Sequence, residues 1–386
     1  MKIAIIGAGI AGLLPAYYLA KQGIQVSIYE EESYAARRCS YANGGQVSVC
    51  NSEVWNNWHT VLKGIKWLFK RDAPLLVRPQ PDLDKIKWMF NFVKQTAKNQ
   101  HQRKTIETIK LGLESRRLYQ ELIAQEELQF DQSSCGILHF YKSTSEFDRA
   151  RQLKDLFEEH GCEWQIVDAQ QAKSIEPRLD HLHDLVGGVW TPSDWTGDIH
   201  KFCTQLADRL TTKYQVKIYY DRPIGHIKDL VGYDYIVVAA GISSRKFARQ
   251  VGVDLGIYPV KGYSVTMESE NLPRVSLLDD QAKIVTSSLG SRLRVAGTAE
   301  LAGENYDIRY DRIQPLLGWT KTNLPNVHRE HYTSWACLRP MSYDMMPVVG
   351  FVRPGTNVIF HTGHGHLGWT LSPATSQYIS ELIFNR

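Results

Sequence analysis

The sequence KIAIIGAGIAG, residues 2–12, joins an isoleucine-rich run to glycines at motif spacing. The run predicts a buried strand, and the segment IAGLLPAYYLAKQG that follows it predicts a helix ending at Gly23. In a GxGxxG turn the glycines allow a tight turn, a close approach to a pyrophosphate, and close packing of helix on strand. The sequence therefore predicts that a dinucleotide is held at the N-terminus of this helix, by Gly7, Ala8, Gly9, Ile10, Ala11 and Gly12.

A second predicted strand, IQVSIYE, completes a βαβ opening and ends at Glu30, eighteen residues after Gly12. A carboxylate at this place is positioned to bind ribose hydroxyls and favours FAD or NAD over NADP. Its neighbour Glu31 belongs to the same predicted set. Pro15 deletes one amide hydrogen bond early in the helix, where a mild kink is tolerated.

The composition indicates a globular chain without a nucleic acid partner. The 386 residues are 43% hydrophobic and 22% charged, with a net charge of only +4. Six scattered cysteines without CxxC or His/Cys pairing predict free thiols in a reducing compartment and no zinc site. The apolar N-terminus lacks a basic leader and is interrupted by glycines, so we do not expect a signal peptide, and no segment is predicted to span a membrane.

The remaining pattern predicts an α/β protein with a second domain inserted into the first. Residues 60–125 have helical spacing, a strand at 136–143 precedes a helix at 144–161, and three alternating strands lie between 257 and 300. Parallel βαβ elements at both ends enclose this antiparallel block. We therefore predict a discontinuous dinucleotide-binding domain (1–60, 196–250 and 333–386) and a substrate domain (61–195 and 251–332).

Three further stretches are compatible with contact to a cofactor. The loop CSYANGGQVS contributes Ser40, Asn43, Gly45, Gln46 and Val47, and the strand YDYIVVAAG ends at Gly241. The glycine-rich turn HTGHGHLGWT leaves backbone amides directed outward at the N-terminus of the last helix. Such amides suit an anionic edge of a bound cofactor. This turn contributes Gly365, His366, Leu367, Gly368, Trp369 and Thr370, and Ile224 completes the predicted set. The histidines of this turn have no Cys or carboxylate at ligand spacing, so a metal site is not predicted.

Taken together, the sequence resembles the D-amino acid dehydrogenase branch of the D-amino-acid oxidase/glycine oxidase superfamily of FAD enzymes. The resemblance runs nearly end to end. It is carried by the GxGxxG opening and by SYANGGQ, KGIKWLFKRDAPL, GGVWTPSDWTGD, YPVKGYS, RLRVAGTAE, LRPMSYDMMPVVG and TGHGHLGWT. It implies an FAD-binding Rossmann-like domain with an inserted substrate domain built on a large mixed sheet.

The resemblance also implies the reaction. The Cα–N bond of an amino acid is oxidised to an imine by hydride transfer to flavin N5, and water hydrolyses the imine to a 2-oxo acid and ammonia. Such chemistry needs orientation more than acid/base groups, so no dedicated catalytic base is expected. The alternatives are an oxidase of glycine, sarcosine or another N-substituted amino acid that produces hydrogen peroxide, and a flavin-binding subunit of a larger complex. An NAD(P)H-dependent monooxygenase would need a second nucleotide-binding motif. The sequence contains one GxGxxG motif, so this interpretation is the weaker one.

In the family, the arginine of the LRP motif pairs with the substrate carboxylate, and here this residue is Arg339. A planar guanidinium grips a carboxylate through two parallel hydrogen bonds and stays charged. The alternative is a structural arginine paired with an internal acid such as Asp344. Tyr263 and Lys283 are the other expected substrate contacts, although Lys283 stands where some relatives have a tyrosine.

Cys337 departs from the glycine that most relatives carry before LRP. The related sarcosine oxidases hold their flavin through a cysteine thioether at the corresponding place, so a covalent link of FAD to Cys337 is one expectation. The alternative is a small buried apolar residue.

Residues 55–92 mix Trp, Leu and Phe with Lys and Arg at helical spacing. Such a pattern is typical either of amphipathic helices packed on the body or of an interfacial patch on anionic lipid. The second alternative fits a dehydrogenase that passes electrons to a membrane quinone. We accordingly expect a cytoplasmic protein, peripheral on the inner face of the cytoplasmic membrane.

Overall fold

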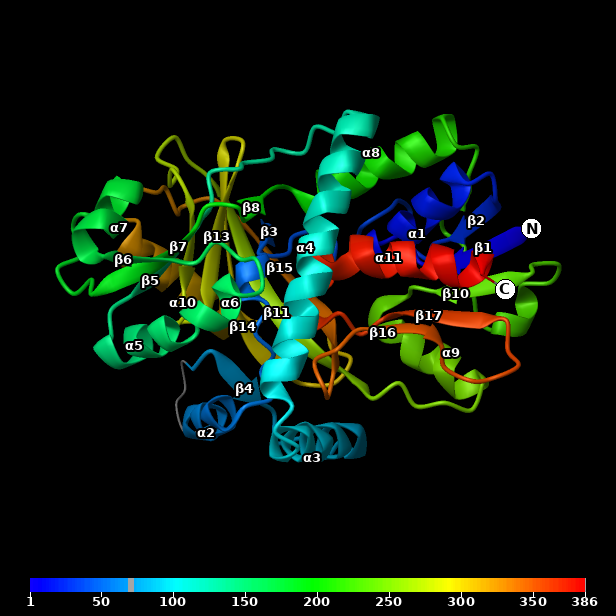
Figure 1. Cartoon of the computed structure of the whole chain (residues 1–386), viewed down its shortest axis with the longest axis horizontal. Coiled ribbons are helices and arrows are strands. Elements are labelled where there is room, and N and C mark those ends of the chain that lie inside the picture. The colour runs from blue at the N-terminus through cyan, green and yellow to red at the C-terminus, as the bar shows by residue number, and fades with distance from the viewer. Residues whose placement is uncertain (69–72, 386) are drawn as a thin grey trace.

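Two large sheets organise the chain. The structure, a computed structural model, describes residues 1–68 and 73–385, so part of the predicted membrane-contact segment, 69–72, lies outside the described residues. In Figure 1 the long helix α4 (His101–Glu126) runs between the two sheets. No helix of the described ranges has the length and apolar content needed to cross a bilayer.

The first sheet is built from the βαβ opening. Among the described residues its six strands follow the order β16-β17-β10-β1-β2-β9, and only β16 runs antiparallel to its neighbour. The strands are β1 (Lys2–Ile6), β2 (Gln25–Tyr29), β9 (Lys217–Tyr219), β10 (Tyr235–Val238), β16 (Val348–Phe351) and β17 (Val358–Thr362). This parallel sheet confirms the predicted Rossmann-like part.

Both faces of β1 are buried, which explains its uninterrupted apolar run. Ile3 and Ile5 belong to the core shared with three helices, whereas Ala4 and Ile6 face a second core under β10 and β17. The three helices are α1 (Ile10–Lys21), α8 (Ile199–Thr212) and α11 (Gly368–Phe384). Because α1 starts directly after the glycine turn, its N-terminus points to the carboxyl end of the sheet.

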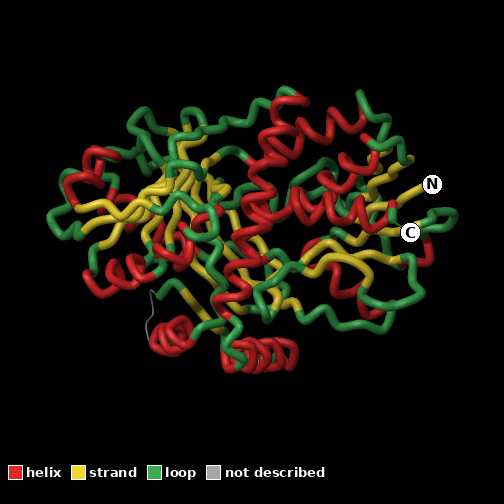
Figure 2. Tube along the Cα trace, viewed as in Figure 1, coloured by secondary structure: helices red, strands yellow, loops and turns green. Residues whose placement is uncertain are grey.

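The second sheet is mixed, as predicted. It has nine strands within the described ranges, mostly antiparallel, with parallel pairs between β12 and β5 and between β4 and β14. Figure 2 shows this sheet as the dense group of strands at the left. The strands are β4 (Leu75–Val77), β5 (Ile137–Tyr141), β6 (Gln165–Asp168), β7 (Gly187–Thr191), β11 (Ile257–Glu268), β12 (Ser276–Asp279), β13 (Ile284–Leu289), β14 (Arg292–Leu301) and β15 (Tyr332–Ser342).

Helices close the second sheet and link it to the first. The remaining ones are α2 (Trp58–Trp67), α3 (Leu83–Ala97), α5 (Thr144–Gln152), α6 (Lys154–Glu158), α7 (Ala169–Ile175), α9 (Ser244–Gln250) and α10 (Tyr310–Asn323). Ile313, Leu316 and Trp319 of α10 pack into the same core as β11 and β14. A short ladder of β3 (Gln46–Val47) and β8 (Trp195–Thr196) ties the predicted cofactor loop to the segment before α8.

Three local predictions differ from the structure. The region 60–125 contains the short strand β4 between its helices, the helix at 144–161 divides into α5 and α6, and β12 adds a fourth strand to the block after 257. The domain ranges stay a prediction, with one difference in sheet membership. β15, placed by prediction at the start of the last dinucleotide-binding segment, pairs along its length with β11 in the second sheet.

Candidate active site

A cavity of about 750 Å³ borders both sheets and collects most of the predicted site residues. The predicted residues that line it are Gly7, Gly9, Ile10, Ala11, Glu30, Glu31, Ser40, Asn43, Gly45, Gln46, Ile224, Gly241, Tyr263, Lys283, Cys337, Arg339, Gly365, His366, Leu367, Gly368, Trp369 and Thr370. Three predicted residues are buried and do not line it: Ala8, Gly12 and Val47.

One end of the cavity is the N-terminus of α1. Gly9 caps the helix with an extended backbone, and no acidic residue lies in the first turn. The hydroxyl of Ser40 accepts a hydrogen bond from the backbone amide of Ile10 (3.1 Å). A Cβ atom on Gly12 would overlap the carbonyl oxygen of Gly7, so only glycine allows this packing of turn on helix. Because no acidic side chain lies at this end of the helix, the helix dipole favours the charge of a phosphate there.

Glu30 lies beside this turn at the end of β2. Its carboxylate accepts hydrogen bonds from the backbone amides of Ala8 (2.5 Å) and Glu32 (2.9 Å). Burial raises the pKa of Glu30, and the two amide donors oppose this rise. Glu31, in contrast, is exposed and lies 3.6 Å from Arg38. The fixed Glu30 side chain suits recognition of ribose hydroxyls.

The histidines of the C-terminal turn are held by the protein itself. His361 Nδ1 lies 2.6 Å from the carbonyl oxygen of Ala11, and both His361 and His364 hydrogen-bond to Thr375. The ring of His366 stacks on Trp55 at a centroid distance of 4.4 Å. Burial, and then the charge of Arg339, lowers the pKa of His366 to about 3, so its ring is neutral at pH 7.

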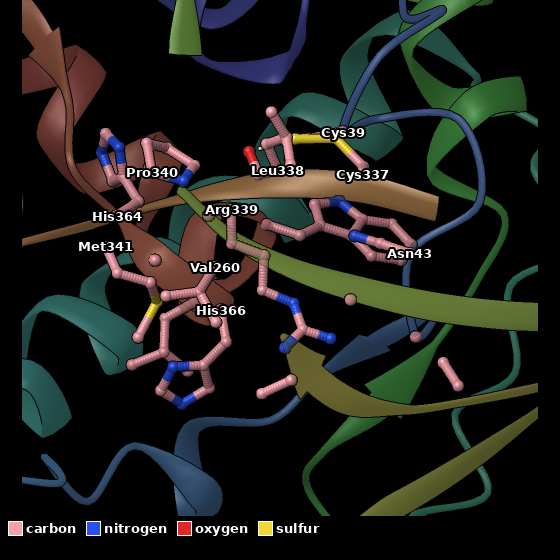
Figure 3. Close-up of a pocket in the computed structure, with 18 of the residues that line it drawn as sticks. Cys39, Asn43, Val260, Cys337, Leu338, Arg339, Pro340, Met341, His364 and His366 are labelled. Atoms are coloured by element: carbon pink, nitrogen blue, oxygen red, sulfur yellow. Dashed lines mark hydrogen bonds between the residues drawn. A yellow bond between two sulfur atoms is a disulfide. The ribbon is translucent and has the colours of Figure 1, made fainter. Parts of the chain in front are cut away.

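Arg339 enters the cavity without an ion-pair partner among the described residues. It lies on β15 opposite Val260, and Figure 3 shows its guanidinium pointing into the open centre, away from Cys337. Within residues 1–68 and 73–385 it forms no ion pair, since Asp344, the alternative partner, binds Lys104 at 3.1 Å. Burial alone lowers the pKa of Arg339 to about 10, so the group is charged at neutral pH. A half-buried cation that faces a cavity without an internal partner is suited to an anionic ligand.

The other two predicted substrate contacts differ from each other. The ring of Tyr263 lines the cavity, but its hydroxyl donates to the fully buried carboxylate of Glu300. Glu300 also accepts a 2.7 Å hydrogen bond from Arg78 and lies 3.3 Å from Lys261. The hydroxyl of Tyr263 is therefore committed to this cluster, and no motif in the sequence predicts the cluster. Lys283 also lines the cavity, and it pairs with Asp280.

Cys39 and Cys337 form a disulfide across 298 residues, with a Cα–Cα distance of 5.4 Å. The prediction that all six cysteines are free thiols is therefore wrong for this pair, while the other four, Cys50, Cys135, Cys162 and Cys203, carry free thiols. The bond joins the predicted cofactor loop to the strand that carries Arg339 (Figure 3). Spacing alone could not reveal it, because the two residues meet only when the loop folds back on β15.

The cavity suits a large ligand with polar edges. Five of its lining side chains have a buried polar atom without a hydrogen-bond partner in the described parts of the chain: His139 Nε2, Trp164 Nε1, Thr298 Oγ1, His366 Nδ1 and Trp369 Nε1. Buried polar groups are normally paired in native proteins. Together with the N-terminus of α1 and the fixed Glu30, these atoms fit a dinucleotide cofactor such as FAD.

Comparison with known proteins assigns the class. The sequence model of the family DAO, described as FAD dependent oxidoreductase, matches residues 2–382. The chain belongs to this family and is an FAD-dependent oxidoreductase, as the resemblance implied.

Particular relatives are similar over their full length. The chain is 45% identical to "D-amino acid dehydrogenase 3" of Mesorhizobium japonicum, covering 99% of this chain and 97% of the relative. It is 35% identical to "D-amino acid dehydrogenase" of Dechloromonas aromatica, covering 100% and 97%. Among solved structures, glycine oxidase from Bacillus cereus superposes with a TM-score of 0.76 at 21% identity, covering 100% of this chain and 95% of that one. The last similarity confirms the fold.

Proposed function

We propose that the protein catalyses FAD-dependent oxidative deamination of a D-amino acid to the 2-oxo acid and ammonia. The observation that carries this proposal is the charged guanidinium of Arg339, which enters the cavity without an internal partner. Relatives named D-amino acid dehydrogenase, matched along their whole length, support the D-configuration and the dehydrogenase type.

In this proposal the residues of the chain orient the substrate relative to the cofactor. Bound FAD would accept the hydride from Cα, with Glu30 and the N-terminus of α1 holding its ribose and phosphates. Arg339 binds the substrate carboxylate through two parallel hydrogen bonds and fixes the position of Cα. Proton transfer by nearby side chains is disfavoured at pH 7, since His366 has a low pKa and burial raises the pKa of Tyr263. No protein acid or base is therefore assigned.

The test uses the purified yellow protein under anaerobic conditions. We expect D-amino acids from a panel of both enantiomers to bleach the flavin absorbance, whereas the L-enantiomers leave it unchanged. Bleaching by glycine or sarcosine, with rapid reoxidation in air, would instead support the oxidase alternative. Bleaching by no amino acid would favour the flavin-binding subunit and contradict the proposal.

We propose that FAD is bound without a covalent link while Cys337 is in its disulfide. One sulfur cannot hold both Cys39 and the flavin, so the thioether expected from sarcosine oxidases requires prior reduction of this bond. We expect acid precipitation of the oxidised protein to leave all yellow colour in the supernatant. The denatured chain should show two more thiols after reduction than before, and Cys337→Ser should show no such increase. Flavin fluorescence from the protein band on a denaturing gel would show a covalent link and contradict the proposal.

For the electron acceptor, we propose a lipid-soluble quinone reached from an anionic bilayer. Large apolar side chains of α2 and α3 are exposed, among them Leu83 (83%) and Phe90 (68%). We call this set the α2/α3 patch: Trp58, Leu62, Ile65, Leu68, Leu83, Ile86, Met89, Phe90 and Val93. Ile65, Leu68, Met89 and Val93 also line the cavity. An apolar surface flanked by lysines and continuous with the cavity supports contact with the inner face of the cytoplasmic membrane.

The patch predicts binding to vesicles that contain anionic phospholipid. Replacing Leu83 and Phe90 together with serine should lower flotation with such vesicles several-fold, because two deeply inserting side chains are lost. The matched control is Val231→Ser, which removes an equally exposed (84%) apolar side chain outside the patch. Equal flotation of all three proteins, or binding unaffected by high salt and by omission of anionic lipid, would contradict the membrane role.

A further inference from the structure

Thr298 occupies a β-bulge next to the cavity. In the β11–β14 ladder, Tyr263 pairs with Gly297 and Lys261 with Glu300, so two residues of β14 lie opposite Gly262 alone. Bulges of this kind re-aim a side chain and occur next to active sites. The position therefore differs from an ordinary strand residue.

The backbone of Thr298 is in the left-handed region, with φ of +56°. A β-branched residue is strongly disfavoured there, whereas glycine adopts this conformation at no steric cost. The chain has threonine at this position, although glycine would adopt the same backbone conformation without strain. Strain of this kind is commonly stored at sites where the side chain is needed.

The side chain of Thr298 is also unpaired. The residue is 5% exposed, lines the cavity, and its Oγ1 has no hydrogen-bond partner in the described parts of the chain. A threonine in a strand normally satisfies its hydroxyl or exposes it to water. Here the hydroxyl is left for a group that enters the cavity.

The guanidinium of Arg339 belongs to the same part of the cavity. It lies across Gly262, since a Cβ atom on that glycine would come within 2.5 Å of its Cζ. The bulge at Thr298 lies opposite the same glycine on the neighbouring strand. The hydroxyl and the guanidinium thus border one region of the cavity from two sides.

We propose that Thr298 is a substrate-binding residue whose hydroxyl donates a hydrogen bond to the carboxylate held by Arg339. Each carboxylate oxygen can accept two hydrogen bonds, so the guanidinium leaves positions for a further donor. The inference rests on the proposed function, because it assumes an amino acid carboxylate at Arg339. The strained backbone is then the structural requirement for aiming this hydroxyl.

The test measures binding rather than turnover. Isovalerate, a carboxylate without an amino group, is titrated into the FAD-loaded protein and followed by perturbation of the flavin spectrum. Thr298→Val should weaken its binding roughly tenfold or more, the usual effect of losing a hydrogen bond to a charged group. Thr298→Ser keeps the hydroxyl and should stay within about twofold of the wild type.

A second pair of variants separates the hydroxyl from the backbone. Thr298→Ala and Thr298→Gly both lack the hydroxyl and should bind isovalerate equally weakly. Thr298→Gly should nevertheless melt at the higher temperature of the two, because glycine relieves the positive φ. A purely structural role would instead make affinity follow stability.

The outcomes distinguish this inference from the proposed function. Tight binding of isovalerate by wild type and by Thr298→Val alike overturns the role of Thr298 and leaves the function in place. Weaker binding of FAD by Thr298→Val, with unchanged isovalerate affinity once the variant is reloaded with FAD, also overturns it, since the hydroxyl would then face the cofactor. A wild-type protein that neither binds isovalerate nor is bleached by any amino acid overturns both.

Discussion

Replacement of Arg339 with leucine is expected to lower kcat/KM for the D-amino acid by about 30-fold to a few thousand-fold. Truncating one partner of an enclosed charge pair costs about 2–5 kcal/mol, and each 1.4 kcal/mol is about tenfold in affinity. The reason is local, because no described acid pairs with this guanidinium and the carboxylate of the substrate is its expected counter-charge. Anaerobic flavin reduction and titration with a non-oxidisable carboxylate both measure the loss.

The same variant should not lose stability. An enclosed charge without a partner is a cost to the folded state, so an apolar side chain of similar size is expected to leave the melting temperature unchanged or to raise it. Arg339→Lys keeps the charge but not the planar fork, and its affinity should lie between wild type and Arg339→Leu. The control Arg103→Leu removes an exposed arginine of α4 and should change neither quantity. A marked fall in the melting temperature of Arg339→Leu would reveal a structural partner and contradict the assignment of Arg339 to the substrate carboxylate.

Local signals in the sequence were sufficient to predict which glycine-rich turns and which acidic residue border the cavity. The glycine turn at 7–12 and the acid at the end of the second strand belong to one βαβ unit, so their positions beside the cavity could be predicted. The same holds for the C-terminal turn, where glycines precede the last helix. Arg339 was predictable for a different reason, since a charge within an apolar strand needs a partner and a family motif marks the position.

Contacts between distant segments could not be predicted in this way. The Cys39–Cys337 bond and the hydrogen bond of Tyr263 to Glu300 depend on loop closure and on the register of β11 against β14. A shift of one residue in that register would turn Tyr263 to the other face of the sheet. The bulge at Thr298 is likewise a property of the ladder, because nothing in RLRVAGTAE indicates which residue takes the positive φ.

The second prediction with a large expected effect concerns Gly262, and it also depends on the register of β11 against its neighbours. The guanidinium of Arg339 lies directly over this glycine of β11, and a Cβ atom there would overlap its terminal nitrogen. Gly262→Ala should therefore displace the guanidinium by about 1 Å and lower kcat/KM roughly 100-fold, since misplacement on this scale has effects of that order. The chain should still fold, because the clash involves the flexible end of a side chain and Gly262 has no positive φ.

A double-mutant cycle gives this prediction its sharpest form. If Gly262 acts only by giving Arg339 room, Gly262→Ala should have a large effect in the wild type and almost none in the Arg339→Leu background. Additive losses in the two backgrounds would instead mean that the extra methyl group obstructs the substrate or the flavin directly. Gly318→Ala on α10 is the matched control, since an added Cβ atom meets nothing within 4 Å there. The cycle thus measures whether glycine in KGYS and arginine in LRP, 77 positions apart in the chain, act as one carboxylate-binding unit.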